Sequence, residues 1–363
     1  MREAIQLQLV NQSDPEQSHD SVLTPLSEVS KQRGLIDIAN RLDRIRSWLE
    51  ADLDDLESAL ESTRQNTSDL GRLAAQHLLE QPGKRIRPLC VFVASRLGRA
   101  VAPQVVRDLA VAAELAHAAT LLHDDVIDQG AERRGAPTAR VVFGNSASVL
   151  GGDHLLIEAL SRVNRSGEPR LMTRIIDVIG AMVSAEALQL EYRGRFVPEE
   201  SVYQRVVLGK TSVLFSWALM AGGMAAGLKD LELNALERSG DRLGLAFQLV
   251  DDLLDLAGDP AVTGKDSLLD LREGKLTWPL LVACERDASL LPDLQRVAAD
   301  WSSAEISLPA LRNRIVATGC IELTRQRALD AAAEAKSNLS VLQRSAARDA
   351  LDTVIDAAVE RAR

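Results

Sequence analysis

Two stretches of the chain place aspartates directly after apolar runs, LLHDDVIDQGAERRG at 121–135 and FQLVDDLLDLAGD at 247–259. In a helix, positions i and i+4 share a face and position i+1 lies on its flank. Each stretch therefore gathers three carboxylates, which repel one another strongly unless cations neutralise them. Mg²⁺ prefers oxygen ligands and is usually held by carboxylates together with phosphate oxygens. The sequence predicts magnesium ions that hold a diphosphate between two clusters, Asp124, Asp125 and Asp128 in the first and Asp251, Asp252 and Asp255 in the second.

A simpler interpretation of such aspartates is that they cap helices or lie on solvated faces. The segment ADLDDLES at 51–58 fits that description, since its acids stand among polar neighbours. A single DDxxD pattern would therefore be weak evidence for a site. Two copies that both follow apolar runs favour the functional interpretation.

Basic residues lie near both clusters in the sequence. The turn GKRIRP, bounded by Gly and Pro, holds Lys84, Arg85 and Arg87, so three cations can converge there on one anion. Each basic residue alone can be a solvated surface charge. Within a chain of net charge -10 they together indicate sites for phosphate groups, bound directly or through magnesium. The other members of this basic set are Arg133, Arg134, Lys210 (with Thr211 beside it), Lys265 and Lys275.

The composition favours packed helices in a protein that does not bind nucleic acid. Apolar residues make up 46% of the 363 residues and aromatic residues only 3%. The acidic balance opposes nucleic-acid binding, which needs a basic face. The three cysteines lack metal-ligand spacing, and no Cys/His set suggests zinc. Widely separated cysteines are typical of a protein in a reducing cytoplasm.

The elements that position these residues are predicted to be helices. Helical periodicity is interrupted by short Gly- and Pro-containing breaks, which gives about ten to thirteen helices and an all-α fold. No linker divides the chain, so we expect one domain over 34–363 after a flexible tail over 1–33. The tail lacks a signal-peptide pattern. The most apolar window, 212–228, contains three glycines and is shorter than a typical membrane span, which predicts a buried core helix and no transmembrane segment.

Five motifs in order, GKRIRP, LLHDDVIDQGAERRG, GKTSVLF, FQLVDDLLDLAGDPAVTGK and DLREGKLTWPL, resemble those of the trans-prenyltransferases, the polyprenyl diphosphate synthases. The resemblance covers residues 80–285. It implies the isoprenoid synthase fold, a single all-α bundle around a deep central cavity, usually in a homodimer. It also implies condensation of isopentenyl diphosphate with an allylic prenyl diphosphate to a linear product.

The resemblance assigns roles to the residues that match these motifs. About three Mg²⁺ ions per site would lie on the allylic diphosphate. Their ligands would be Asp124, Asp125, Asp128, Asp251 and Asp255, with Asp252 in the same cluster. The allylic diphosphate would also contact Arg133, Lys210 and Lys265, with Lys275 among the substrate-binding residues. The isopentenyl diphosphate site would use Lys84, Arg87, His117 and Arg134, with Arg85 nearby. Thr211 and Gln248 would line the reacting carbons. Without the resemblance, His117 is equally well read as a core histidine.

Small residues precede the first cluster on the same predicted helix. Ala116, Ala119 and Thr120 stand where short-chain members of the family carry a bulky side chain that closes the cavity floor, so the resemblance implies a product longer than C15. Alternatively, the alanines only allow close helix packing, and a bulky residue elsewhere, such as Met182, Trp217 or Met220, closes the tunnel.

The chain departs from the family pattern in three segments, of which SLLD at 267–270 lacks the glycine common before DLREGK. The segment at 182–190 has Ser184, Ala185 and Glu186 where the family usually carries Glu-Gly-Glu, and the segment EYRGRFVPEES after it is short. Two other functions remain open. A noncatalytic partner subunit of a prenyltransferase heterodimer would not need intact aspartates in both clusters. A terpene cyclase would have little need of GKRIRP.

Overall fold

The computed structural model describes residues 27, 31, 36–63, 69–81, 83–99, 102–257, 268–300 and 306–360. Its first half contains α3 (Ile36–Trp48), α4 (Glu50–Thr63), α5 (Leu70–Leu79), α6 (Ile86–Ser95), α7 (Pro103–Ile127), α8 (Ala139–Phe143), α9 (Asn145–Arg165) and α10 (Pro169–Tyr192). Its second half contains α11 (Glu200–Val207), the π-helix η1 (Leu208–Ser212), α12 (Val213–Ala225), α13 (Asp230–Ala257), α15 (Leu269–Arg272), α16 (Trp278–Arg286), the 3₁₀ turn η2 (Ala288–Leu290), α17 (Leu291–Ala299), α18 (Leu308–Ala317), α19 (Cys320–Asn338), the 3₁₀ turn η3 (Leu339–Val341) and α20 (Ala346–Glu360).

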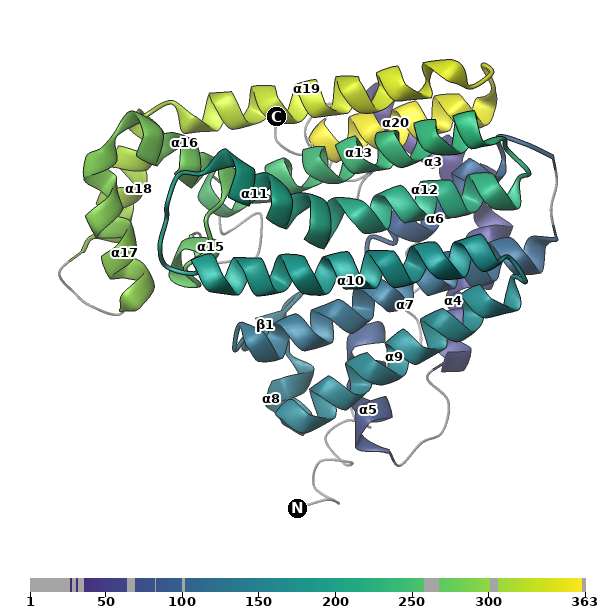
Figure 1. Cartoon of the computed structure of the whole chain (residues 1–363), viewed down its shortest axis with the longest axis horizontal. Coiled ribbons are helices and arrows are strands. Elements are labelled where there is room, and N and C mark those ends of the chain that lie inside the picture. Colours follow the sequence, from purple (N-terminus) through teal and green to yellow (C-terminus); the bar gives the residue numbers. More distant parts are fainter. Residues whose placement is uncertain are drawn as a thin grey trace.

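The predicted all-α fold is confirmed. Figure 1 shows α19, α13, α12 and α10 following one another across the molecule, with α7 and α9 on the other side of α10. The described helical segments are more numerous than the ten to thirteen expected, because short breaks such as Gly144, at φ 87°, divide runs that read as one helix. The predicted break at 129–138 contains a small hairpin, in which β1 (Glu132–Arg133) pairs antiparallel with β2 (Ala136–Pro137).

One hydrophobic core extends through the described chain, from Ile38 on α3 to Val359 on α20. Helix α7 runs through it: Pro103 stands in its first turn, and an Ala- and Leu-rich sequence buries nearly every residue of its middle. The single domain over 34–363 stays a prediction. The predicted tail over 1–33 lies outside the described residues, apart from Ser27 and Lys31.

The most apolar helix of the described chain, α12, is a core helix, as predicted. All of its residues from Leu214 to Gly223 are buried. Among the described residues, Glu200–Ala225 is long and apolar enough to cross a membrane by length and composition, but 67% of its most apolar window is buried inside the protein. This burial is what a core helix of a folded protein shows.

Helices α12 and α13 approach each other closely at two glycines of α13. A Cβ on Gly240 would lie 2.4 Å from Ser216 Cα, and one on Gly244 would lie 2.3 Å from Ser212 Cα. Only glycine permits this approach of two backbones. The contact fixes α13 against η1, and Gln248 follows Gly244 by one turn of the same helix.

Candidate active site

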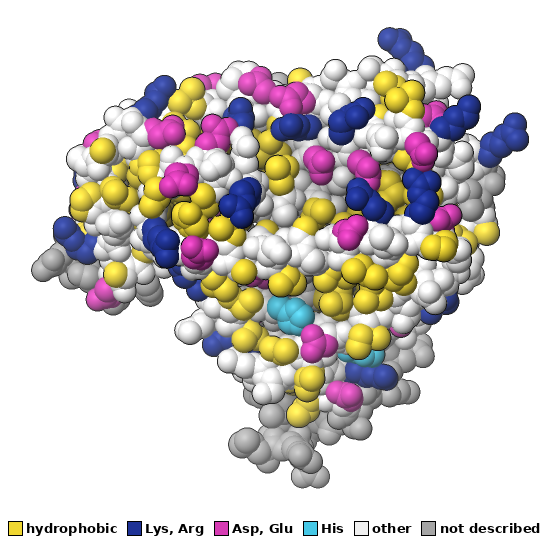
Figure 2. Space-filling view, in the orientation of Figure 1, with side chains coloured by type: hydrophobic (Ala, Val, Ile, Leu, Met, Phe, Trp, Pro, Cys, Tyr) yellow, Lys and Arg dark blue, Asp and Glu magenta, His cyan; other side chains and the backbone are white. Residues whose placement is uncertain are grey.

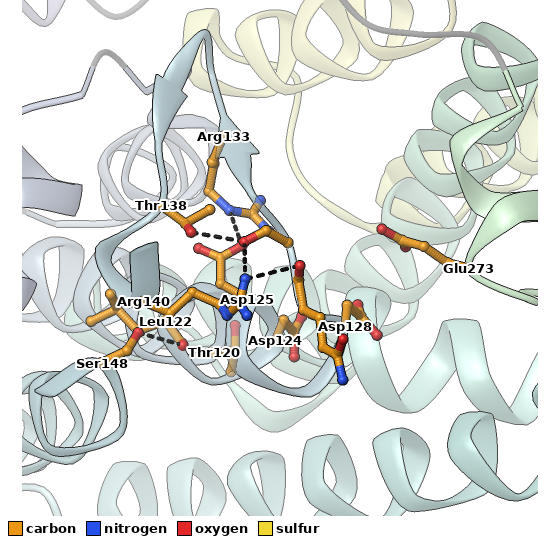
Figure 3. A network of polar contacts seen from close by, with 12 residues as sticks. Thr120, Leu122, Asp124, Asp125, Asp128, Arg133, Thr138, Arg140, Ser148 and Glu273 are labelled. Carbon is orange, nitrogen blue, oxygen red and sulfur yellow. Dashed lines mark hydrogen bonds and ion pairs between the residues drawn. The ribbon is translucent and has the colours of Figure 1, made fainter. Parts of the chain in front are cut away.

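The three aspartates of the first cluster lie together at the end of α7 (Figure 3). Asp124 and Asp125 stand in its last turn, and Asp128 follows as its C-terminal cap. Lys210 Nζ on η1 lies 3.3 Å from Asp124 Oδ2. Arg133 Nε, from the hairpin, donates to Asp125 Oδ1 at 2.9 Å. Two of the cations predicted from the sequence are therefore in place beside these carboxylates.

The third aspartate has two cationic partners. Lys275 Nζ donates to Asp128 Oδ2 at 2.7 Å and to Glu273 Oε2 at 2.6 Å. Arg193, just after α10, pairs with the other oxygen of Asp128. Burial opposes ionisation of Asp128, but Lys275, Lys210 and Arg193 overcome it and hold its pKa below the usual range. Asp128 is therefore charged at neutral pH.

Asp252, in the second cluster, has a different environment. It is 2% exposed and accepts hydrogen bonds from Gln248 Nε2, the Tyr203 hydroxyl and the backbone N–H of Trp278, each at 2.9 Å. Burial and the nearby Asp270 raise its pKa to about 7. Both carboxylate oxygens are thus engaged by donors that tie α13 to α11 and α16. The structure places Asp252 as an anchor of the helix that carries the cluster.

Asp255, one turn later, lies beside the segment that follows α13. Its Oδ1 accepts from the backbone N–H of Leu269 at 2.9 Å. Burial and Asp270 raise its pKa to about 8. Asp252 and Asp255 on α13 and Asp270 on α15 therefore lie close enough to disfavour one another's ionisation. A divalent cation would relieve this repulsion.

The π-helix η1 connects the two clusters. Lys210 reaches Asp124 on α7 and also donates to Gln189 Oε1 at 3.0 Å. The next residue, Thr211, donates from its hydroxyl to Gln248 Oε1 on α13 at 2.9 Å. One turn of chain thus touches both aspartate-bearing helices. π-Helical turns inside α-helices often occur at functional sites.

Basic side chains surround His117, which lies on α7 two turns before the aspartates. Burial, together with Arg87, Arg134, Arg133 and Arg85, holds the pKa of His117 well below its usual value. Arg87 lies over the Phe215 ring, with its guanidinium carbon 4.5 Å from the centroid. Burial lowers the pKa of both Arg87 and Arg134. Arg134 is exposed, and Arg87 and His117 are half-buried, so the group is open to solvent on one side. Like charges gathered in one place repel one another unless an anion joins them, which makes this group a candidate anion site.

Two cations of GKRIRP differ from Arg87 in their placement. Lys84 is exposed at the surface. Arg85 is buried and forms ion pairs with Glu57 and Glu114, so its guanidinium is occupied by protein carboxylates. Lys265 lies outside the described residues.

The residues expected to control product length lie on α7 before the first cluster. Ala116 and Ala119 are 2% and 1% exposed, and the Thr120 hydroxyl donates to the backbone carbonyl of His117 at 2.8 Å. Met182 and Trp217, the alternative closing residues, are also buried. The deep cavity expected beneath the aspartates stays a prediction.

The profile of the polyprenyl synthetase family matches residues 69–304. The chain belongs to this family. Its sequence is 34% identical over 325 residues to the octaprenyl diphosphate synthase of Escherichia coli (strain K12), a match that covers 89% of this chain and 99% of that relative. The prediction of a trans-prenyltransferase is thereby confirmed.

Two solved structures are similar to the synthetase in both fold and sequence. A polyprenyl synthase from Caulobacter crescentus CB15, complexed with calcium and isoprenyl diphosphate, has a TM-score of 0.82 at 33% identity and covers 87% of this chain and 97% of its own. A decaprenyl diphosphate synthase from Rhodobacter capsulatus has a TM-score of 0.81 at 34% identity, with 88% and 99% covered.

The carboxylates of the synthetase fit a hard divalent cation. Within the described ranges no three acidic, His or Cys side chains are already assembled around a metal position, because cationic side chains hold the aspartates of α7. One oxygen stands out: Asp125 Oδ2 is buried, and no group in the described part of the chain hydrogen-bonds to it. A donor set made only of carboxylate oxygens suits Mg²⁺ better than Zn²⁺.

Several residues at the site of the synthetase were not predicted from the sequence. They come from separate helices and contact the predicted residues through their side chains: Glu114, Gln189, Arg193, Tyr203 and Glu273. Three of them lie in segments that the sequence singled out: Arg193 in the shortened segment at 191–201, Gln189 in the divergent segment at 182–190, and Glu273 in the motif DLREGKLTWPL. Glu114 and Tyr203 stand at ordinary helical positions whose role depends on the tertiary arrangement.

Proposed function

We propose that the synthetase catalyses the Mg²⁺-dependent condensation of isopentenyl diphosphate with an allylic prenyl diphosphate, giving a linear trans-polyprenyl diphosphate longer than C15. The observation that carries this proposal is the hairpin at 132–137, which lies between the carboxylate cluster and the basic group around His117. Arg133 binds Asp125 in the carboxylate cluster, and Arg134 belongs to the arginines around His117. A metal-bound diphosphate and a directly bound one can therefore lie next to each other.

The proposed metal ligands are carboxylates at the C-terminal ends of α7 and α13. About three Mg²⁺ ions would stabilise the charge that develops on the leaving diphosphate. Asp252 is better suited to hold α13 in place, because its oxygens accept three protein hydrogen bonds. The ligands in this proposal are Asp124, Asp125, Asp128, Asp251 and Asp255.

The cations next to these carboxylates would hold the allylic diphosphate directly. Lys210, Arg133 and Lys275 now neutralise aspartates, and each can turn to phosphate oxygens when a metal takes its place. Their charge favours departure of the diphosphate, which leaves an allylic carbocation. The oxygens of Thr211 and Gln248, held together at 2.9 Å, can steady that positive charge.

Isopentenyl diphosphate would bind at the basic group with Lys84, Arg87, His117 and Arg134. The lowered pKa of His117 keeps its ring neutral at pH 7, so it would act as a hydrogen-bond donor while the arginines supply the charge. The alkene then attacks the carbocation, and a proton is lost to the released diphosphate. No nucleophilic side chain is required by this route.

We also propose a cytoplasmic homodimer. The three cysteines, Cys90, Cys284 and Cys320, are free and buried, which suits a reducing compartment. Helices α9 and α10 pack against each other and expose large apolar side chains, and Figure 2 shows hydrophobic side chains gathered over them. Exposed apolar patches of this kind mark protein interfaces.

A product assay tests the proposed function. Purified protein with Mg²⁺, labelled isopentenyl diphosphate and an allylic primer should yield longer linear diphosphates, and EDTA should stop the reaction. Hydrocarbon products would indicate a terpene cyclase. Absence of turnover by the chain alone would indicate a subunit that needs a different partner.

A further inference from the structure

Arg85 lies beside the other arginines of the basic group, but its guanidinium is bound by two carboxylates of the protein. It stands directly before α6. Its Nη1 donates to Glu114 Oε1 on α7 at 2.6 Å, and its Nε donates to Glu57 Oε1 on α4 at 3.1 Å. The Arg85 side chain is 6% exposed. Burial alone would lower its pKa, but Glu114 and Glu57 overcome that effect and raise the pKa above its usual value.

The two contacts maintain an unusual backbone conformation at Arg85. Its φ is 44°, in the left-handed region that side-chain-bearing residues rarely adopt and that persists only where the surroundings enforce it. Here the two carboxylates hold the guanidinium on both edges. Lys84 precedes this residue and Arg87 follows it by two positions, so the directions of both depend on the conformation that the carboxylates maintain.

Arg85 also lies next to another arginine of the site. A Cβ added to Gly83 would lie 2.8 Å from Arg85 Nη1 and 3.1 Å from Arg134 Nη1, so both guanidiniums flank this glycine. Glu114 opposes the lowering of pKa that burial imposes on Arg87 and Arg134. One buried carboxylate therefore acts on three arginines of the basic group.

We propose that Glu57 and Glu114 are positioning residues that set the geometry of the anion site through Arg85. The identity of the anion as isopentenyl diphosphate rests on the proposed function. Glu57 lies on α4, outside the 69–304 segment that matches the family profile. This contact gives the helices before residue 69 a role at the site, although the sequence of α4 reads as a solvated acidic face.

The chain contains a matched arrangement nearer the start of α7, and none of its residues belongs to the basic group. Arg162 Nη1 donates to the buried Asp108 on α7 at 3.0 Å, and Arg162 Nε donates to Glu158 Oε1 at 2.8 Å. The Glu158 side chain is 29% exposed, and that of Glu57 is 30% exposed. Each arginine thus has one buried acid on α7 and one half-buried glutamate, so Glu158→Ala is a control for loss of an equivalent contact.

The test measures binding of inorganic pyrophosphate to the full chain in EDTA by isothermal titration calorimetry. Glu57→Ala should weaken binding on the order of tenfold, because small misplacements of binding groups are costly. Glu57→Gln, which keeps an acceptor for Arg85 Nε, should bind nearly as the wild type does. Glu158→Ala should leave the Kd unchanged while lowering the Tm about as much as Glu57→Ala does. In Mg²⁺, Glu57→Ala should raise the KM for isopentenyl diphosphate alone, with kcat and the allylic KM unchanged.

Removing a negative charge near arginines would by itself strengthen pyrophosphate binding, so tighter binding by both Glu57 variants would overturn the positioning role. An unchanged Kd in Glu57→Ala, an equal weakening in Glu158→Ala, or no pyrophosphate binding by the wild type would overturn it too. A wild type that binds pyrophosphate but elongates no primer would refute the proposed function, and the comparison of variants would still stand.

Discussion

The protonation of Asp255 links the site to stability. Burial and Asp270 raise its pKa to about 8, whereas an aspartate in an unfolded chain ionises near 3.9. Between these values the folded protein binds more protons than the unfolded chain, so this group lowers the free energy of unfolding as pH rises from about 4 to about 8. We expect the Tm measured in EDTA to fall over that range.

The matched variant for this prediction is Asp255→Asn, which does not titrate. Its Tm should depend less on pH than that of the wild type. The proposed Mg²⁺ ions would bind the ionised carboxylates, so Mg²⁺ should raise the wild-type Tm more at pH 8 than at pH 5. Equal pH slopes for the two proteins would show that Asp255 does not titrate in this range.

Ala119 allows a test of product length. It is 1% exposed on α7, five residues before Asp124. If the growing chain passes this position, Ala119→Phe should shorten the product while condensation continues, as chromatography of the dephosphorylated products would reveal. Overpacking costs about 1–3 kcal/mol, so the Tm should fall as well.

Ala113→Phe is the control, because Ala113 is equally buried on another face of the same helix. It should lower the Tm without changing product length. An unaltered product distribution in Ala119→Phe would place the end of the cavity elsewhere, with Met182 or Trp217 as the closing residue.

At the scale of elements, the contact between α13 and η1 decides whether the clusters meet. In an exposed helix, replacing glycine by alanine stabilises by about 1 kcal/mol. At Gly244 the new Cβ would meet Ser212 Cα at 2.3 Å, so the helices must separate. Gly244→Ala should therefore destabilise the protein by about 1–3 kcal/mol in urea unfolding and lower kcat, since Thr211 and Gln248 move apart.

Asn234→Ala, at an exposed position of the same helix, serves as its comparison. This substitution should be neutral or slightly stabilising and should leave kcat unchanged. Normal activity in Gly244→Ala would mean that the site tolerates a shift of α13.

The elements also show how far the sequence could predict the structure. Apolar periodicity and Gly/Pro breaks predicted the all-α fold, and the i, i+4 spacing predicted that the aspartates of α7 lie together. The π-turn at 208–212 could not be predicted, because α- and π-helical turns differ by one residue and not in composition. The sequence motif did not distinguish Asp252 from Asp251. Only the hydrogen bonds from Tyr203 and Trp278, on other helices, show that Asp252 holds α13 in place.

At the scale of the whole molecule, α9 and α10 carry apolar side chains that the chain itself does not cover. On α9, Leu150 and Ile157 are 58% and 63% exposed, and on α10, Ile176 and Val183 are 55% and 66% exposed. Each pair is seven residues apart, the spacing of a helix face that packs against partner helices. Burying such side chains is favourable by about 25 cal/mol per Å² of apolar surface, which supports association of two copies through this face.

The double variant Ile157→Glu with Val183→Glu should therefore convert a dimer to a monomer in light scattering coupled to size-exclusion chromatography. Two carboxylates per chain would be desolvated against apolar surface, which costs more than the contact gains. Val341→Glu is the control, since Val341 is 47% exposed in η3, away from this face, and should leave the mass unchanged. A wild type that is monomeric at micromolar concentration would contradict the dimer, and a double variant that remains dimeric would place the interface on another face.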